Sequence, residues 1–456
     1  MRERKLPLVG GFFFAYALLA LVASLVLQTQ PHDIQRMGQL LVLVASVFVT
    51  APGLNAGAST LVISGLLVYA AIGGGRWALI ETLHLVSIWM LAQVWTARLR
   101  WRPEPAIPAL LALLAGIYLL LLLPRWAALV FENLRFLPQD FFVGFSNPRV
   151  FGHWVTLTLP VLVIVRLQRI EMGRHVWLID SLIAFWVCFA FASGTRGSWA
   201  AIVGATLVCA CAGAGGRRIA RALVRAGVLG GALYALMFVL LPREFAAQAT
   251  LQGMSRLSEG ANLSGRDVLW MKALDGICSH PWMGLGPMAY AANGNGIAAH
   301  PHGMLLQAAY EWGVPLTLIV LFWGLHALWH QFSLCRKEGE PLRAALLTAV
   351  IGGLLQAQID GVLVMPFGQT MFVLLCACLA ALPTGRQPDI EVSSSIGFRG
   401  VMSCLVLAQC LLLAPELKRL DAWAESRLHA SGLPYYQPRY WVQGLIPAES
   451  PLINFP

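Results

Sequence analysis

Long apolar runs alternate with short polar connections along almost the whole chain. The runs lie near residues 8–27, 38–52, 58–74, 77–97, 106–123, 151–167, 177–193, 198–213, 222–241, 313–332, 344–363, 366–383 and 397–414. Most of them approach the roughly 20 residues that an α-helix needs to cross a bilayer. Because backbone polar groups in hydrocarbon must be satisfied within the protein, these runs are predicted to be helices. We therefore expect an all-α, polytopic transmembrane helical bundle of about 12 or 13 spans.

The basic residues gather in alternate connections between these runs. If the N-terminus lies inside, the inner connections hold more than half of the 32 Lys and Arg residues. Cytoplasmic loops carry this kind of excess, so the pattern predicts an inside N-terminus. The first run, 8–27, is too long for the core of a cleaved signal peptide, and we expect it to be retained as a membrane anchor.

The composition agrees with a membrane protein and changes how the charge is interpreted. Hydrophobic residues make up 58% of the chain and charged residues 12%, whereas soluble domains contain about 25% charged residues. The net charge of +10 follows from the basic inner connections, so we expect membrane lipids and no nucleic acid as partners. The nine cysteines form no CxxC pair, and no redox or zinc site is predicted.

Two outer connections are much longer than the others, at 125–150 and at about 242–312. Long connections between helices are usually either functional or disordered. The second contains tryptophan, methionine and glycine rather than repeats, which favours an ordered loop. The chain is accordingly divided into N-terminal spans (1–241), an outer loop (242–312), C-terminal spans (313–414) and a tail (415–456).

Arginines in tight polar turns are the first candidate functional groups. Arg196 lies in Ser193-Gly-Thr-Arg-Gly-Ser198, Arg266 follows Ser264-Gly265, and Arg149 immediately precedes a span. A guanidinium beside backbone N–H groups, as at the start of a helix, suits a phosphate group. The alternative for each is an interfacial arginine, or one paired with a nearby carboxylate.

Two histidines, His300 and His302, flank Pro301 in the outer loop. The proline predicts an extended segment. A neutral imidazole near the membrane surface can accept a proton from a hydroxyl group, and the alternative is a hydrogen-bonded structural histidine.

Carboxylates outside the spans are scattered, without a DxD motif or a paired cluster. We therefore predict no metal site and no cofactor. Glu81, Asp180 and Asp360 lie within or at the ends of predicted spans. Ionisable residues in such positions are often functional, and a proton-coupled lipid-glycan transporter would use them. A purely structural assembly partner would need neither these carboxylates nor the arginines.

Several motifs in order resemble the O-antigen ligase/polymerase superfamily, which also includes protein O-oligosaccharyltransferases. They are Ser-Gly-Arg266-Asp-Val-Leu-Trp270, Ser279-His-Pro-Trp-Met-Gly284-Leu-Gly-Pro287, His300-Pro-His302-Gly-Met-Leu-Leu-Gln307 and Tyr310-Glu-Trp-Gly313-Val-Pro315, preceded by the turn around Arg196. The motifs cover about residues 190–315. The chain departs from the family pattern at Gly303, where members usually have Asn, and alignment on Gln307 places His302 at the essential histidine.

The resemblance implies a GT-C-type, inverting, metal-independent glycosyltransferase with its active site on the periplasmic side of the bacterial inner membrane. The donor would be a glycan on undecaprenyl diphosphate. His302 would be the general base, and Arg196 and Arg266 would neutralise the diphosphate leaving group. Arg149 and Arg256 are further candidates for the same anion, and His300 and Glu311 for substrate binding or for orienting the loop.

The acceptor differs within the superfamily. An O-antigen ligase transfers the glycan to lipid A-core in lipopolysaccharide biosynthesis, a polymerase to a second lipid-linked glycan, and a protein (pilin) O-oligosaccharyltransferase to a serine or threonine. The short tail after Glu416 favours the ligase, because many protein transferases carry a large domain there. The protein transferase and the polymerase remain alternatives.

Overall fold

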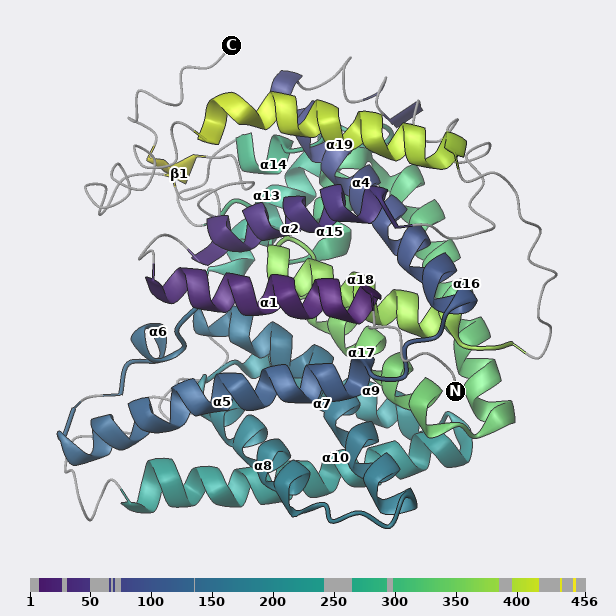
Figure 1. Cartoon of the computed structure of the whole chain (residues 1–456). Helices are drawn as coiled ribbons and strands as arrows, with labels where there is room; N and C mark the ends of the chain where they lie inside the picture. The colour runs from purple at the N-terminus through teal and green to yellow at the C-terminus, as the bar shows by residue number, and fades with distance from the viewer. Residues whose placement is uncertain are drawn as a thin grey trace. The chain divides into compact units, whose positions relative to one another are not determined.

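The computed structural model describes residues 8–26, 31–49, 65–66, 69, 75–134, 136–241, 265–292, 298–384, 396–417, 435–436 and 446–447 (Figure 1). The chain divides into two compact units. Unit 1 comprises Met1–Leu27, Glu104–Asn262 and Leu328–Gln356. Unit 2 comprises Gln28–Pro103, Leu263–Ala327 and Ala357–Pro456.

Unit 1 is built from helices that are distant in sequence. They are α1 (Leu8–Val26), α5 (Ile107–Phe131), α6 (Pro138–Phe141), α7 (Pro148–Glu171), α8 (Trp177–Ala192), α9 (Arg196–Ala210), α10 (Gly213–Tyr234) with its continuation η1 (Ala235–Leu240), and α17 (Pro341–Gln356). Helix α7 packs against α5, α8, α9 and α17, so it is the central helix of this unit.

Unit 2 contains the remaining elements. They are α2 (Pro31–Val47), α4 (Gly75–Trp101), α13 (Arg266–Ser279), α14 (Ala289–Ala292), α15 (Met304–Trp312), α18 (Pro366–Ala381), α19 (Ile396–Leu417) and the short antiparallel pair β1 (Tyr435–Tyr436) and β2 (Ile446–Pro447). Helix α16 (Val314–Glu338) contributes residues to both units. Helix α4 packs against α2, α18 and α19.

Six helices in the described part of the chain are long and apolar enough to cross a membrane: Gly75–Trp101, Ile107–Phe131, Pro148–Glu171, Gly213–Leu240, Val314–Glu338 and Gly397–Pro415. Five shorter apolar helices accompany them. Helices overlap every predicted run except 58–74, of which only residues 65–66 and 69 are described. The prediction of an all-α, multi-pass membrane protein is confirmed.

The first helix of unit 1 is capped by a distant carboxylate. Both oxygens of Glu104, from the segment before α5, accept hydrogen bonds of 2.8–3.0 Å from the backbone N–H groups of Leu8, Val9 and Gly10. The first N–H groups of a helix have no partner within it. The acidic side chain satisfies them and complements the positive end of the helix dipole.

A cluster of aromatic side chains forms the core of unit 1. Trp154 and Trp186 meet edge to face with ring centroids 4.7 Å apart, and Tyr118 contacts both. The indole N–H of Trp186 donates to Thr158 Oγ1 at 3.0 Å, and the Tyr118 hydroxyl donates to the carbonyl of Val143 at 2.9 Å. Large rings therefore fill the core while two of their polar atoms remain hydrogen-bonded.

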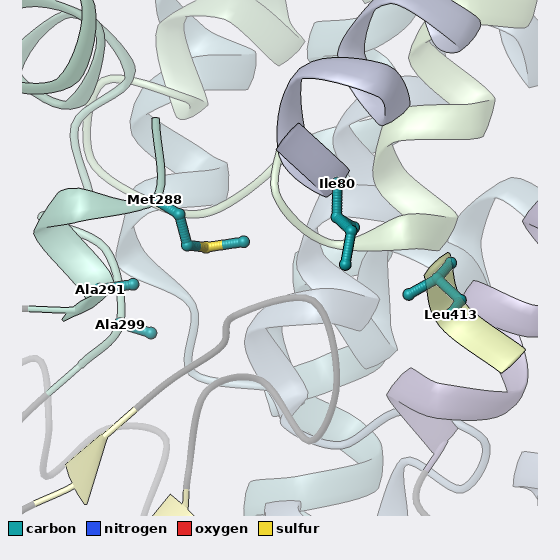
Figure 2. Close-up of a cluster of buried hydrophobic side chains, with 5 residues drawn as sticks. All are labelled: Ile80, Met288, Ala291, Ala299 and Leu413. Atoms are coloured by element: carbon teal, nitrogen blue, oxygen red, sulfur yellow. The ribbon is translucent and has the colours of Figure 1, made fainter. Parts of the chain in front are cut away.

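In unit 2 an apolar cluster attaches the outer loop to two long helices. Figure 2 shows Met288, Ala291 and Ala299 of the loop together with Ile80 of α4 and Leu413 of α19. All five side chains are buried. Burial of this apolar surface holds Met288, Ala291 and Ala299 against the helices, because each contact removes hydrocarbon from water.

Two predicted boundaries are wrong in ways that affect the site. The run 344–363 is not one helix: α17 ends at Gln356, a turn follows, and α18 begins at Pro366. Hydropathy does not separate the turn from the helix, because Val362 and Leu363 are themselves apolar. Asp360 therefore lies in a connection rather than inside a span. The second helix begins earlier than its apolar run, at Pro31, since its polar face with Arg36 is buried within unit 2.

The tight packing of α10 on α8 leads to a stability prediction. An added Cβ at Gly230 would lie 2.2 Å from Val187 Cγ1 and 3.0 Å from the Ala184 carbonyl, whereas one at Gly227 would meet nothing within 4 Å. We expect Gly230→Ala to lower the free energy of unfolding by about 1–3 kcal/mol, whereas Gly227→Ala, which gains helix propensity without a clash, should leave it unchanged or raise it by up to about 1 kcal/mol. Thermal unfolding of the detergent-purified variants measures both, and equal midpoints would contradict this packing.

Candidate active site

Two glycine-containing motifs of the outer loop interlock through their backbones. The N–H groups of Leu285 and Gly286 donate to the carbonyls of Tyr310 and Glu311, at 2.8 and 3.0 Å. An added Cβ at Gly284 would lie 2.6 Å from the Glu311 carbonyl carbon, and one at Gly313 would lie 2.3 Å from the Trp282 oxygen. Both glycines also have positive φ. Only glycine allows this approach, so the two motifs form one structural unit.

A small tyrosine-rich core holds helices α13 and α15 together. Tyr290 and Tyr310 pack edge to face with centroids 5.1 Å apart, beside Leu269 and Ala273 of α13. The Tyr290 hydroxyl donates to the Leu269 carbonyl at 3.0 Å. Burial, together with the neighbouring Tyr310, raises the pKa of the Tyr290 hydroxyl, so this group remains a protonated donor.

The segment carrying the two histidines is held at both ends. The indole N–H of Trp270 donates to the Pro301 carbonyl at 3.0 Å, and the N–H of Met304 donates to the Ala357 carbonyl at 2.8 Å. The prediction of an extended segment is wrong at His302, whose φ is +50°. This left-handed conformation closes a turn in which the His302 N–H donates to His300 Nδ1 at 3.2 Å. Left-handed residues cost energy and cluster at functional sites.

His302 faces a carboxylate from the turn between α17 and α18. Its Nδ1 lies 3.4 Å from Asp360 Oδ1, within ion-pair distance although not aligned as a hydrogen bond. The His302 side chain is 15% exposed and the Asp360 side chain 9%. Catalytic hydrogen bonds are often long before substrate binds. The arrangement is therefore that of a histidine with a carboxylate able to orient it.

His300 is buried beside the same turn. Its ring lies 4.2 Å from the His302 ring, centroid to centroid, with the planes at 67°. An added Cβ at Gly361 would lie only 2.8 Å from His300 Cε1. The His300 ring therefore packs directly against Gly361 and forms part of the boundary of the site.

Glu311 lies at the C-terminal end of α15 and is 1% exposed. One carboxylate oxygen accepts from the backbone N–H of Tyr290 at 3.3 Å, and the other accepts from Gln307 Nε2 at 3.4 Å. These contacts brace α14 against α15. The carboxylate therefore orients the loop, and it also lines the cavity described below.

Arg266 is the first residue of α13. Trp270 follows it by four residues, and residues at this spacing share a helix face. Arg266 thus lies on the face of α13 whose Trp270 contacts the histidine segment. The cap residue of this helix is Gly265, in a left-handed conformation with φ of 76°. Ser264 and Arg256 lie outside the described residues.

In unit 1, Arg196 is the exposed first residue of α9 and follows a compact turn. Ser193 Oγ donates to the Ala190 carbonyl at 2.7 Å and lies 2.9 Å from Thr195 Oγ1. Gly194 has φ of +65°. The Ser198 hydroxyl accepts from Gln356 Nε2 at 2.8 Å. The turn that precedes Arg196 is therefore fixed by several hydrogen bonds.

Arg149 belongs to the first turn of α7, which Asn147 caps by accepting from the Arg149 N–H at 2.9 Å. Gly152, three residues later, packs so closely on the Arg196 turn that an added Cβ would lie 2.4 Å from Ser198 Oγ and 2.8 Å from Thr195 Oγ1. The helix starts that carry Arg149 and Arg196 are therefore neighbours. Helix N-termini and arginines both attract anions, so these two helix starts concentrate positive charge in unit 1.

Unit 2 contains a cavity of about 200 Å³ beside the histidine segment, with both charged and apolar side chains in its lining. Its charged lining consists of one guanidinium, Arg36, and the carboxylates of Glu81, Glu311 and Asp360. His84, His300, Gly303, Gln307 and Gln369 also line it.

An apolar groove of about 400 Å³ adjoins this cavity and shares with it the side chains of Leu85, Met304, Ala308 and Trp312. Its other lining residues include Val86 and Trp89 of α4 and Leu316 and Val320 of α16. The chemistry of this lining suits a hydrocarbon chain. Polar and apolar binding surfaces therefore lie side by side in one unit.

Within the described residues, 8–447 with their gaps, no three His, Cys, Asp or Glu side chains converge as a set of metal ligands. His302 and Asp360 supply two such groups, and a structural or catalytic zinc site takes three or four protein ligands.

Comparison with known families bears directly on this arrangement. The family model described as O-antigen ligase matches residues 181–321. Over these residues the chain is similar to the O-antigen ligase family. The resemblance inferred from the motifs is confirmed for this ligase-like segment, and its family consists of glycosyltransferase-like enzymes. No curated protein matches the chain.

The ligase-like segment contains Arg196, Arg266, His300, His302 and Glu311. In unit 2, Arg266 begins α13, His300 and His302 lie in the connection before α15, and Glu311 lies in α15. Arg149 and Arg196 belong to unit 1.

Sequence reasoning missed two contacts at the histidine. Asp360 was considered only as a proton-relay residue within a span, and Trp270 only as part of a motif. No sequence signal pairs Asp360 with His302, because their proximity depends on a tertiary contact, in which the Met304 N–H after the histidine segment donates to the Ala357 carbonyl before Asp360. For Trp270, its place four residues after Arg266 was a usable signal.

The hydrogen bond from Trp270 to Pro301 predicts how the histidine segment is held. Trp270→Phe keeps the ring but removes the donor, a loss of about 1 kcal/mol. We expect backbone amides of residues 298–304 to exchange with deuterium several-fold faster. Trp282→Phe is the matched control, because that side chain is 77% exposed. Unchanged exchange in Trp270→Phe would show that other contacts hold the segment.

Proposed function

We propose that this protein is an O-antigen ligase that transfers a glycan from undecaprenyl diphosphate to lipid A-core. The observation that carries the proposal is the pairing of His302 with Asp360, at 3.4 Å, where His302 lies in a segment that matches the O-antigen ligase family. The reaction is placed at the periplasmic face of the inner membrane, within a GT-C-type helical bundle whose outer loop, 242–312, carries the motifs.

His302 acts as the general base in this proposal. Asp360 faces Nδ1 and orients the ring, so that Nε2 takes the proton from the acceptor hydroxyl. The acceptor oxygen attacks the anomeric carbon of the donor as the bond from that carbon to the diphosphate oxygen breaks. Attack from the face opposite the leaving group inverts the anomeric configuration. His300 and Glu311 hold the loop that presents this base.

Arginines stabilise the departing diphosphate. Arg196 and Arg149 stand at neighbouring helix starts in unit 1, and Arg266 begins a helix in unit 2. Guanidinium groups and backbone N–H groups neutralise charge that develops on phosphate oxygens, which is the role that a metal plays in other transferases. We assign Arg256 to the same anion from the sequence alone.

The apolar groove supports a lipid-linked donor. It is lined by α4 and α16, two helices apolar enough to cross a membrane, and it adjoins the cavity beside the histidine segment. A substrate with a polar head and a long isoprenoid chain needs both surfaces together.

Other members of the superfamily differ in the acceptor, so a polymerase or a protein (pilin) transferase is distinguished by the product. Two of the three carboxylates named for the transporter alternative have other partners. Asp180 is ion-paired with Arg166 at 2.5 Å, and Asp360 faces His302 from the turn between α17 and α18. The third, Glu81, is buried in α4 and lines the cavity.

The catalytic pair gives a kinetic prediction. In proteoliposomes with an undecaprenyl-diphosphate glycan and lipid A-core, His302→Ala should lower kcat by at least roughly 100-fold. Asp360→Asn should lower kcat with little change in KM, because it disturbs the orientation of the base and not binding. His280→Ala, an exposed histidine of the same loop, serves as the control. Full activity in both variants would show that another residue is the general base. Transfer to a pilin peptide but not to lipid A-core would show that the acceptor is a protein.

Metal removal gives a separate prediction. If arginines supply the charge stabilisation, wild-type transfer in excess EDTA should stay within about twofold of the untreated rate. Arg266→Ala and Arg196→Ala should each lower kcat by roughly 100-fold under the same conditions. Loss of wild-type transfer in EDTA, restored by a divalent cation, would contradict the metal-independent mechanism.

A further inference from the structure

Helix α10 of unit 1 has a buried face and an exposed face of different composition. The helix packs against α8, α9 and α17, and its buried residues include Ile219, Leu223, Ala226 and Gly230. On the opposite side, Arg217, Arg221, Val224 and Val228 are all exposed. Their spacing of three and four residues aligns them along one face of the helix. This arginine–valine stripe begins with two guanidinium groups and continues with two apolar side chains.

Two other arginines of α10 pair with carboxylates of unit 1. Arg218 lies 2.7 Å from Glu171, at the end of α7, and Arg225 lies 3.8 Å from Asp180 of α8. Asp180 also pairs with Arg166 of α7, at 2.5 Å. The positive charge of these arginines is therefore balanced by the helices next to α10.

Arg217 and Arg221 have a different environment. Among the described residues, no carboxylate lies within ion-pair distance of either side chain. Arg221 Nε donates to the backbone carbonyl of Arg217 at 3.4 Å, which directs the side chain back along the helix toward Arg217. Residues four apart on a helix have Cβ atoms about 5–6 Å apart, so both guanidinium groups can reach the oxygens of one phosphate.

The length of the helix sets the depth of the stripe in a membrane. The apolar segment Gly213–Leu240 has 28 residues, whereas a span requires about 20. The extra turns at its start place Arg217 and Arg221 at the level of the lipid headgroups. Val224 and Val228, which are 61% and 67% exposed, follow at the level of the acyl chains. From Arg221 to Val228 the helix rises by about 10 Å, so the stripe passes from charge to hydrocarbon as a phospholipid does.

The orientation rule for membrane proteins accounts for part of this pattern. It explains why basic residues gather in a connection on one side of the bilayer. It does not specify which face of a helix carries them, nor does it place exposed valines in register behind them. The combination of two arginines without carboxylate partners and an aligned apolar surface is a property of the folded helix.

We infer that the arginine–valine stripe of α10 is a binding site for an anionic phospholipid from the leaflet at which α10 begins. The phosphate lies between the guanidinium groups of Arg217 and Arg221, and an acyl chain lies along Val224 and Val228. Basic side chains at a membrane surface attract anionic lipids. Such a site does not depend on the proposed transfer reaction.

Lipid retention by the full-length protein tests this site. The protein is released from nanodiscs that contain equal amounts of phosphatidylglycerol and phosphatidylcholine with identical chains, and native mass spectrometry measures which lipid stays bound. The wild type should retain phosphatidylglycerol preferentially. Arg217→Gln and Arg221→Gln should each lower the ratio of the two retained lipids by about fivefold. Arg221→Lys should change it by less than about twofold, because lysine also binds phosphate as a point charge.

Arg174→Gln is the matched control, because it removes the same charge from an exposed position in the connection between α7 and α8. Its ratio should equal that of the wild type, and thermal midpoints check that all variants are folded. Glycerol 1-phosphate, compared with chloride at equal ionic strength, should not displace the bound lipid, because it lacks the acyl chains.

Four results would overturn the site. The first is a wild type without preference for phosphatidylglycerol, and the second is an equal loss in Arg174→Gln and Arg221→Gln, which would indicate general surface charge. The third is displacement of the lipid by glycerol 1-phosphate, which would show that the arginines bind a free phosphate. The fourth is a lipid-free dimer that is lost in Arg221→Gln, which would assign this face of α10 to a second copy of the chain.

Discussion

The close backbone contact between residues 281–286 and 310–314 is the constraint on which the site in unit 2 depends. Three backbone hydrogen bonds join the two segments, including one from the Val314 N–H to the Pro281 carbonyl at 2.8 Å. The contact requires Gly284 and Gly313, because a Cβ at either position would penetrate the facing backbone. It positions the end of α15, and α15 in turn begins immediately after the histidine segment. The geometry at His302 therefore follows from backbone packing several residues away.

Several buried polar groups in this protein make hydrogen bonds within their own unit. In low-dielectric surroundings a polar group without a partner is costly. The indole of Trp186, the hydroxyl of Tyr118 and the guanidinium of Arg36 each have hydrogen-bond partners. Glu104 likewise satisfies the first turn of α1. These hydrogen bonds offset the cost of burying individual polar groups in helices that are otherwise apolar.

Charged side chains occupy different settings in the two units. In unit 1, Arg149 and Arg196 stand at helix starts, where backbone N–H groups add to their attraction for anions. In unit 2, the cavity beside His300 is lined by the carboxylates of Glu81, Glu311 and Asp360 and by the guanidinium of Arg36.

The sequence alone determined the fold class, because a bilayer needs long apolar helices and their length and composition are visible in the chain. It also indicated the ligase-like segment, since the motifs from Arg196 to Gly313 are local and ordered. Only the tertiary structure decided that Asp360 faces His302 and that Arg36 reaches the same cavity. These residues are far apart in sequence, and their meeting depends on the packing of α2 against α18 and on the contact of Met304 with Ala357. Hydropathy is a one-dimensional quantity and carries no record of those contacts.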